Sequence, residues 1–346
     1  MTLMSSEIKE QPKVLRGMAV TQLETVKKIA QAVKEKDIRF ILTAARGTSN
    51  HGAVYGNYMF KIMNGMPTGI AELSVLTHYD AEVNFKNTMV IAVSQSGGST
   101  DVCEFLRKAK DGGALAIAFT NIADSRLAGI ADYTVCFGAG EEKSVAATKT
   151  YCGTLAGFYM LSMAMAGKED AFIKENLEKA AVAVEGVLAR EEEIKALSAR
   201  FRYLKAGMIV ARGINYCNAL ELSLKLTETC YIKMRGFSSA EFLHGPIASL
   251  ATGDACFVFA PDGKTVGQVE EGIDKLNAKG IETIVFSDKE DILAKAKVGI
   301  KMPSVCECLA PIVYIPYGQL LANYLSVSIG NNPDTPEGLT KVCETI

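Results

Sequence analysis

The sequence predicts an α/β protein of two tandem domains, each a parallel sheet flanked by helices in a three-layer, doubly wound arrangement. Three observations carry this prediction: the length of 346 residues, short apolar runs that alternate with helical patterns, and a second half that repeats the first. A chain of this length exceeds the size at which a single core usually stops growing, so two domains are expected.

Five short runs rich in β-branched and apolar residues are the expected strands of the first half. Each is apolar at both alternating positions, which is typical of strands buried on both faces of a parallel sheet. The runs are RFILTAA (39–45), GIAEL (69–73), TMVIAV (88–93), ALAIAFT (114–120) and DYTVCFG (132–138). Between them, TDVCEFLRKAKDGG places Val102, Phe105, Leu106 and Ala109 at helical spacing and ends in glycines. This segment is therefore expected to be a helix with a glycine C-cap.

The second half repeats this pattern at a fixed distance. Ala45 is followed by Arg-Gly, and so is Ala211, which lies 166 residues further on (211 − 45). At the same offset, VIAVS (90–94) corresponds to CFVFA (256–260), AIAFT (116–120) to ETIVF (282–286), and YTVCFG (133–138) to GIKMPS (299–304). The repeat predicts a duplicated α/β unit. The expected division is a helical lead-in (1–35), a first domain (36–190), a second domain (191–330) and a C-terminal tail (331–346).

Charge and composition argue against several classes of partner. The chain has 37 basic and 39 acidic residues without a basic stripe, so neither nucleic acid nor an anionic membrane is expected as a partner. The longest apolar stretch, GTLAGFYMLSMAMAG, is shorter than the ~20 residues of a membrane span, so a buried helix is expected. The polar start and nine scattered cysteines fit a cytoplasmic protein with reduced thiols. The three histidines have no ligand spacing, so neither a metal nor a cofactor is expected.

Small hydroxyl side chains gather where expected strands end. VSQSGGST (93–100) directly follows the third run, and ARGTSN places Thr48 and Ser49 after the first. In an open parallel sheet, ligands bind beyond the carboxyl ends of strands, where loop N–H groups and helix N-termini favour anions. Gly97 and Gly98 would let the backbone approach closely. Since GxxxxGK[ST] is absent and no GxGxxG follows the first run, the sequence favours a phosphate without a nucleotide, with a plain helix cap as the alternative.

Several motifs together resemble the SIS (sugar isomerase) family. They are RGTSN, SQSGGST, EEKSVAATKTY, ELSLKLTETCYIKMRGFSSAEFLHGP and TPEGLTKVCE, and they run in order through nearly the whole chain. They are similar to the isomerase half of glucosamine-6-phosphate synthases, and AGEEKSVAATKTY is nearest to stand-alone deaminases of glucosamine 6-phosphate. A glutamine-hydrolysing half is not expected, because few residues precede the first run and Thr2 stands where that half exposes a cysteine.

The resemblance implies roles for individual residues. Glu228 would move a proton between C1 and C2, His244 of a neighbouring subunit would open the sugar ring, and Lys341 would form a Schiff base. Taken singly, these three also fit a helix face, a turn and a solvated tail charge; their joint occurrence favours the catalytic roles. The substrate-binding residues would be Gly47, Thr48, Ser49, Ser94, Gln95, Ser96, Ser99, Val145 and Ala147.

Three departures from the synthase pattern surround the expected sugar site. Arg46 replaces a cysteine, Ala147 a serine and Gly98 an acidic residue. An extra cation at Arg46 would either favour a second anionic group on the substrate or pair with a carboxylate such as Glu72 or Glu142. The equivalent Arg212 in the repeat weakens a catalytic role for Arg46.

The resemblance implies a sugar-phosphate substrate and a homodimer with a shared active site. The expected activity is glucosamine-6-phosphate deaminase, which releases fructose 6-phosphate and ammonia. One alternative is a deglycase of a phosphorylated Amadori compound such as fructoselysine 6-phosphate. The other is a non-catalytic sugar-phosphate sensor. A sensor usually needs an output element, and the sequence shows neither a helix-turn-helix nor a basic arm, which disfavours this alternative.

Overall fold

The computed structural model describes residues 1–79 and 81–341, which group into two compact units with one sheet each. The first-sheet unit contains Glu10–Glu142, Lys149–Glu178 and the chain from Thr340. The second-sheet unit contains Met1–Lys9, Lys143–Thr148 and Lys179–Leu339. The domain boundary near residue 190 stays a prediction, and residues 342–346 of the expected tail lie outside the described residues.

The first sheet has five strands in the order β2-β1-β3-β4-β5, and every neighbouring pair is parallel. All six residues of β3 and all six of β4 are buried, as the unbroken apolar runs predict. The strands are β1 (Phe40–Ala45), β2 (Thr68–Ile70), β3 (Thr88–Val93), β4 (Leu115–Thr120) and β5 (Tyr133–Cys136).

Helices cover both faces of this sheet. On one face, Phe119 of β4 packs against Phe158 of α8, with ring centroids 4.8 Å apart. On the other face, Phe105 and Leu106 of α6 join Val90 of β3 in a buried core cluster. The first face is covered by α2 (Gln11–Thr21), α3 (Leu23–Glu35), α4 (Gly47–Asn64) and α8 (Lys149–Met165), and the second by α5 (Ser74–Thr77), α6 (Thr100–Asp111) and α7 (Arg126–Ile130). The predicted helices over TDVCEFLRKAKD and the long apolar stretch are both confirmed as α6 and α8.

The second sheet repeats the first. Its order β10-β9-β8-β6-β7 is the order of the first sheet read from the opposite edge, and its neighbouring strands are again parallel. The strands are β6 (Ala206–Ala211), β7 (Lys233–Ser238), β8 (Ala255–Phe259), β9 (Glu282–Ser287) and β10 (Val298–Lys301). The structure thus confirms the predicted fold class and the internal duplication.

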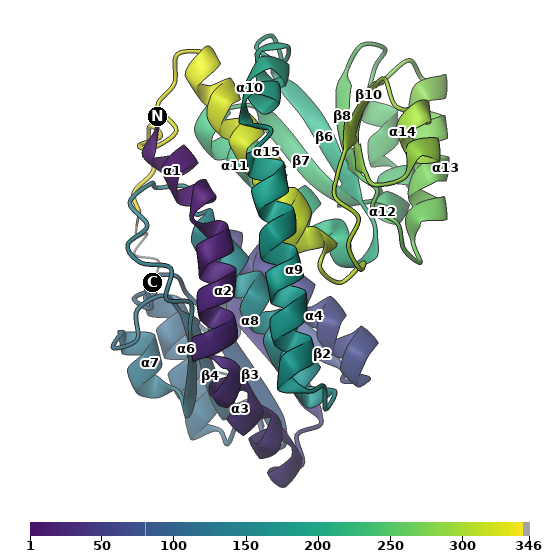
Figure 1. Ribbon diagram of the computed structural model, residues 1–346. Helices are drawn as coiled ribbons and strands as arrows, with labels where there is room; N and C mark the ends of the chain where they lie inside the picture. The colour runs from purple at the N-terminus through teal and green to yellow at the C-terminus, as the bar shows by residue number, and fades with distance from the viewer. Residues whose placement is uncertain (80, 342–346) are drawn as a thin grey trace. The chain divides into compact units, whose positions relative to one another are not determined.

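Helices also lie on both faces of the second sheet, with α13 and α14 on one side and α11 and α15 on the other (Figure 1). Phe286 of β9 contacts Tyr317 of α15, while Val258 of β8 shares a core cluster with Ile273 of α13. The elements of this unit are α1 (Leu3–Lys9), α10 (Glu191–Ala199), η1 (Gly213–Asn215), α11 (Tyr216–Cys230), α12 (Ser239–Leu243), η2 (Pro246–Ser249), α13 (Val266–Ala278), α14 (Glu290–Lys295) and α15 (Ala310–Ser328), together with the end of α9 (Asp170–Leu188).

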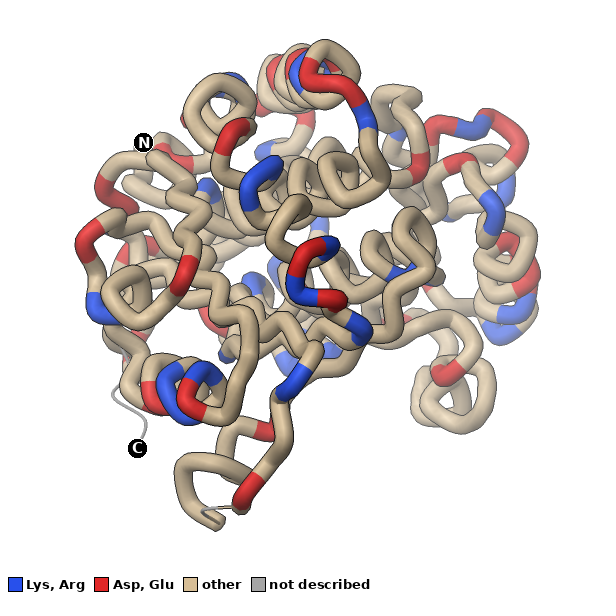
Figure 2. Tube along the Cα trace, turned by 90° about the horizontal axis from the view of Figure 1, so that it is seen from below, with Lys and Arg blue, Asp and Glu red and all other residues tan. Residues whose placement is uncertain are grey.

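Charged residues of both signs are interspersed along the chain, in keeping with its small net charge (Figure 2). Within residues 1–79 and 81–341, none of the helices combines the length and the apolar character that crossing a bilayer requires.

Candidate functional site

The strand order of the first sheet reverses direction between β1 and β3, which makes this point the topological switch of the sheet. From β1 the chain continues through α4 to β2 at one edge, whereas from β3 it continues through α6 on the opposite face toward β4 and β5. The last residues of the two strands, Ala45 and Val93, are register partners, so their loops start side by side and then part. Open parallel sheets bind ligands at such a switch point, beyond the carboxyl ends of the strands.

The loop after β3 is a tight turn that carries hydroxyl groups. The Ser94 N–H donates to Phe119 O at 3.0 Å, and the Gly97 N–H returns to Ser94 O at 3.0 Å. Ser96 Oγ accepts the Gly98 N–H at 3.2 Å. The turn therefore holds Ser94 and Ser96 at the end of β3, and Ser96 Oγ also fixes the loop through its hydrogen bond from Gly98.

Gly97 is required by this turn, and Gly98 is not. Gly97 has φ +64°, and a Cβ there would lie 2.1 Å from Ser125 Oγ. A Cβ on Gly98 would meet nothing nearer than Ser96 Oγ at 3.6 Å. The turn itself thus requires glycine at position 97 but not at position 98, and the expectation that both glycines let the backbone approach a phosphate stays a prediction.

Gln95 and Ser99 complete the loop on either side of the turn. The carbonyl oxygen of Gln95 accepts the Asn121 N–H at 3.0 Å, which ties the loop to the end of β4. Ser99 is the N-cap residue of α6, and its hydroxyl donates to Asp101 Oδ1 at 3.1 Å. The loop thus ends at the N-terminus of a twelve-residue helix, whose partial positive charge favours an anion.

The loop after β1 starts beside the loop after β3, because the two strands are neighbours in register. Gly47 begins α4 with φ +49°, directly after the extended N-cap residue Arg46. Thr48 and Ser49 follow in the first turn of the helix, and both are half-buried. Two helix N-termini and their hydroxyl side chains therefore meet the β1–β3 edge, as a phosphate-binding loop pair requires.

Arg46 pairs with Asp101, a partner that the sequence did not suggest. The Arg46 Nε lies 2.8 Å from Asp101 Oδ2, and the Asp101 side chain is almost fully buried. In the repeat, Arg212 Nε donates to Gln268 Oε1 at 2.9 Å. Both units therefore link a strand-end arginine to the helix that follows the neighbouring strand, α6 after β3 and α13 after β8.

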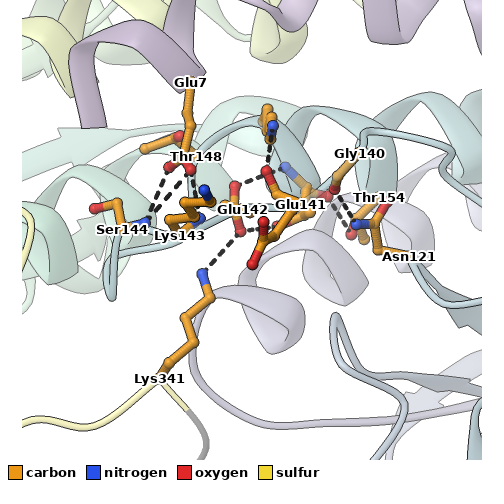
Figure 3. A network of polar contacts seen from close by, with 12 residues as sticks. Glu7, Asn121, Gly140, Glu141, Glu142, Lys143, Ser144, Thr148, Thr154 and Lys341 are labelled. Atoms are coloured by element: carbon orange, nitrogen blue, oxygen red, sulfur yellow. Dashed lines mark hydrogen bonds and ion pairs between the residues drawn. The ribbon is translucent and has the colours of Figure 1, made fainter. Parts of the chain in front are cut away.

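Val145 and Ala147 lie in the segment Lys143–Thr148 of the second-sheet unit, and both are half-buried. The Val145 N–H donates to Asp334 O at 3.0 Å, and the neighbouring Ser144 N–H donates to the Glu7 carboxylate at 3.2 Å (Figure 3). The N–H of Val145 is thus already used within the protein, so a backbone contact from Val145 to a sugar would use its carbonyl oxygen.

Lys341, near the end of the described chain, reaches Glu142 in the first-sheet unit (Figure 3). Lys341 Nζ lies 3.2 Å from Glu142 Oε2, and the Glu142 side chain is buried. The same carboxylate accepts the Thr150 hydroxyl at 2.6 Å and the Thr150 N–H at 3.1 Å. Glu142 is therefore held from α8 and fixes the ammonium group of Lys341.

Glu228 lies near the C-terminal end of α11, beside two charged residues of the same helix. Lys225 Nζ is 2.6 Å from Glu228 Oε2 and 3.5 Å from Glu221 Oε1. The side chains of Lys225 and Glu221 are fully buried, whereas that of Glu228 is 23% exposed. Lys225 thus fixes one oxygen of Glu228, which is the partly accessible carboxylate of this cluster.

His244 is the exposed C-cap residue of α12. Its N–H donates to the carbonyl oxygens of Ala240 and Glu241, both at 3.2 Å, and Gly245 and Pro246 then start η2. The backbone is thus fixed by the turn, while the imidazole is directed to the surface of its unit.

The structure gathers the predicted residues in two groups. The first-sheet unit holds Gly47, Thr48, Ser49, Ser94, Gln95, Ser96 and Ser99 at one sheet edge, together with Lys341; the second-sheet unit holds Val145, Ala147, Glu228 and His244. Their roles stay predictions. Sequence reasoning missed Lys225 and Asp101, and it named Glu142 as a partner for Arg46 rather than for Lys341. The i, i+4, i+7 spacing of Glu221, Lys225 and Glu228 was a signal for the first of these, because such residues share one helix face.

Comparison with known proteins agrees with this geometry. The chain is 34% identical over 345 residues to the glutamine–fructose-6-phosphate aminotransferase (isomerizing) of Thermococcus kodakarensis, which covers 98% of this chain and 57% of that protein. Among solved structures, the C-terminal domain of glucosamine-fructose-6-phosphate aminotransferase from Francisella tularensis shares the fold, with 24% identity, a TM-score of 0.88 and coverage of 97% and 98% of the two chains. So does glucosamine-6-phosphate deaminase from Thermotoga maritima, with 19% identity, a TM-score of 0.75 and coverage of 99% and 100%.

The SIS domain matches residues 36–164 and 205–328, one match over each sheet. The chain spans 57% of the length of the Thermococcus relative. With two SIS matches and two sheets of the same strand order, the chain belongs to the SIS domain family.

Proposed function

We propose that this protein is a phosphosugar isomerase that acts as a glucosamine-6-phosphate deaminase. The observation that carries the proposal is the Glu221–Lys225–Glu228 cluster, which orients one partly exposed carboxylate on α11. A carboxylate held in this way suits a base that shuttles a proton next to a carbonyl carbon. The hydroxyl-lined loops at the β1–β3 switch point support the phosphate end of the substrate.

In the proposed reaction, His244 assists opening of the pyranose ring to the aldehyde. Glu228 then removes the proton from C2, which carries the amine, and returns it to C1, so that the aldose becomes a C2 imine. Water adds to this imine and the C2–N bond breaks, which yields fructose 6-phosphate and ammonia. Lys341 would hold the open-chain ketose by exchanging its own amine at C2.

The ion pair with Glu142 bears on the step assigned to Lys341. Lys341 Nζ lies 3.2 Å from the buried Glu142 carboxylate, and a lysine amine attacks a ketone only in its neutral form. In the proposed attack on a ketone, the Glu142 carboxylate is close enough to accept a proton from the Lys341 amine. Glu142 would thus act on Lys341 as Lys225 acts on Glu228, by fixing the reacting group until the substrate arrives.

The Thermococcus relative supports a second candidate, the amination of fructose 6-phosphate. The name of that relative describes an isomerizing aminotransferase, and the present chain is 34% identical to it over 98% of the present chain's length. Amination is the reverse of deamination at the same carbon and uses the same base. The two candidates therefore differ in the source of nitrogen and in the direction of net flux.

One assay separates these activities. The protein is incubated with glucosamine 6-phosphate, with fructoselysine 6-phosphate, and with fructose 6-phosphate plus ammonium, while ammonia, lysine and hexose phosphates are followed. Ammonia and fructose 6-phosphate from the first substrate support the deaminase, and lysine from the second supports a deglycase. Turnover only in the third arm supports the amination. Binding of all three sugar phosphates without turnover would contradict the proposed enzyme activity and would support a non-catalytic sugar-phosphate sensor.

We further propose a homodimer in which His244 serves the neighbouring site. The exposed position of His244 at the end of α12 supports this, because a turn residue at the surface can reach a second chain. Mixing inactive Glu228→Gln with inactive His244→Ala after mild dissociation should restore part of the activity, since one site of each mixed dimer regains both groups. Persistent inactivity of a mixed dimer verified by mass would contradict the shared site.

A further inference from the structure

The loop between β10 and α15 carries a pair of cysteines that the proposed reaction does not use. Cys306 Sγ and Cys308 Sγ lie 2.9 Å apart. Cys306 is exposed, whereas Cys103, Cys152, Cys217, Cys230 and Cys256 are all buried. Two thiols at this separation are close enough to share one proton.

The turn that brings the sulfurs together is anchored through the residue between them. The Leu309 N–H donates to Cys306 O at 2.8 Å, which closes the turn directly before α15. Glu307 Oε2 accepts the Lys264 N–H at 3.2 Å, and Gly263 lies so near that a Cβ there would be 2.4 Å from Glu307 Cδ. With its middle side chain held by the loop after β8, the Cys-Glu-Cys turn keeps the two flanking cysteines facing each other.

The surroundings make Cys306 the reactive member of the pair. Hydrogen bonding from the Cys308 thiol, helped by the N–H groups of Leu309 and Cys308 and by the charge of Lys179, lowers the pKa of Cys306 to about 7. The same contact raises the pKa of Cys308 above its ordinary value. By contrast, burial raises the pKa of Cys230 to about 12. A thiol whose pKa lies near the ambient pH is the best attacking group in disulfide exchange.

We propose that Cys306 and Cys308 form a reversible dithiol–disulfide couple that exchanges with low-molecular-weight disulfides. The Cys306 thiolate attacks one sulfur of a small disulfide, breaks its S–S bond and releases one small thiolate. Cys308 then loses its proton and attacks Cys306 Sγ, which releases the second thiolate and closes the Cys306–Cys308 bond. Two electrons pass from the protein dithiol to the small disulfide, and the reverse exchange with excess small thiol restores the reduced pair.

The test uses the full chain with glutathione disulfide as the probe. Cys343 lies outside the described residues, so a Cys343→Ser background removes it as a competing partner. After exposure and alkylation, peptide mass mapping should show the loss of two hydrogen atoms from the peptide that contains Cys306 and Cys308. Dithiothreitol should reverse the change, and Cys136→Ser, made at a half-buried cysteine elsewhere, should leave it intact.

Single variants separate the attacking thiol from the resolving one. In Cys308→Ser a glutathione adduct should accumulate on Cys306, because the second attack is lost, whereas Cys306→Ser should leave Cys308 without an adduct. Cys308→Ala should shift the pH midpoint of Cys306 alkylation from about 7 toward about 8.5, and Cys308→Ser, which keeps a hydroxyl donor, should shift it less. The proposal is overturned if the wild-type pair keeps both hydrogens, if Cys306→Ser is oxidised as readily as wild type, or if the midpoint is the same in all three proteins.

Discussion

The ammonium group of Lys225 lies 2.6 Å from the Glu228 carboxylate, three residues further along α11, and the lysine side chain is fully buried. A buried cation between two carboxylates is retained at a cost in desolvation, so loss of one member leaves the others uncompensated. The predictions begin with this cluster.

Lys225→Met should lower the free energy of unfolding by about 3–5 kcal/mol, because the buried Glu221 carboxylate loses its counter-charge. Adding Glu221→Gln should recover part of this loss by removing the buried charge. Chemical denaturation measures both, with Lys275→Met on the exposed side of α13 as the matched control. A loss below about 1 kcal/mol in the single variant would show that the cluster is not a buried ion-pair network.

Glu228→Gln should reduce turnover by roughly 10²–10⁴ while sugar-phosphate affinity changes little, since the amide keeps the shape of the carboxylate but cannot accept a proton. Steady-state kinetics and equilibrium binding together check this. Glu241→Gln, at an exposed carboxylate on α12, is the matched control and should leave turnover unchanged. Intact turnover of Glu228→Gln on every amino-sugar phosphate would rule out the proposed proton transfer.

Ser96→Ala should weaken substrate binding by about 1–3 kcal/mol and raise KM more than it lowers kcat, because a hydrogen bond to a charged group is lost. The variant also removes the acceptor for the Gly98 N–H, so a small fall in thermal stability should accompany it. Ser304→Ala, in an exposed loop of the second-sheet unit, serves as the control. Should KM stay at its wild-type value, Ser96 is not a phosphate ligand.

Gly97→Ala should destabilise the protein by about 1–3 kcal/mol, whereas Gly98→Ala should change stability by less than about 0.5 kcal/mol. A methyl group at Gly97 would collide with Ser125 and would force an alanine into positive φ, and neither problem arises at Gly98. Thermal unfolding of the two variants side by side tests this. Equal effects would mean that the turn rearranges freely.

Lys341→Ala and Lys341→Arg should both abolish covalent trapping of fructose 6-phosphate by borohydride, because neither side chain forms a reducible imine. Lys341→Arg keeps a positive charge for Glu142, so it should retain more sugar-phosphate affinity than Lys341→Ala. Mass spectrometry of the trapped protein gives the readout. Continued trapping in Lys341→Arg would assign the Schiff base to another amine.

The strands that could be predicted are those whose unbroken apolar composition indicates burial on both faces of a sheet. TMVIAV and ALAIAFT became β3 and β4 because both faces are covered, and Phe40–Ala45 and Ala206–Ala211 keep the 166-residue offset. β7 (Lys233–Ser238) was missed, since KMRGFS has two cations and a glycine and becomes a strand only by pairing with β6 at the sheet edge. Local composition does not reveal such tertiary pairing.

The candidate site divides in the same way. The loops of Thr48 and Ser94 could be predicted because the carboxyl ends of parallel strands meet at one edge. The helical spacing of Lys225 and Glu228 indicates their pairing but not the burial of Lys225, whereas the partner of Asp101 is 55 residues away, which no local pattern specifies. Charged side chains in amphipathic helices usually face solvent, so their burial was apparent only in three dimensions.

The links Arg46–Asp101 and Arg212–Gln268 tie the end of one strand in each sheet to the helix after the neighbouring strand. The arginines lie 166 residues apart (212 − 46) and their partners 167 (268 − 101), so the two links occupy corresponding places in the repeat to within one residue. Of the two arginines, Arg46 beside the hydroxyl-lined loops has an acidic partner, Asp101, whereas Arg212 has the neutral partner Gln268. Because this link occurs both in the half that has these loops and in the half that lacks them, we expect it to hold the strand ends in place rather than to select the substrate.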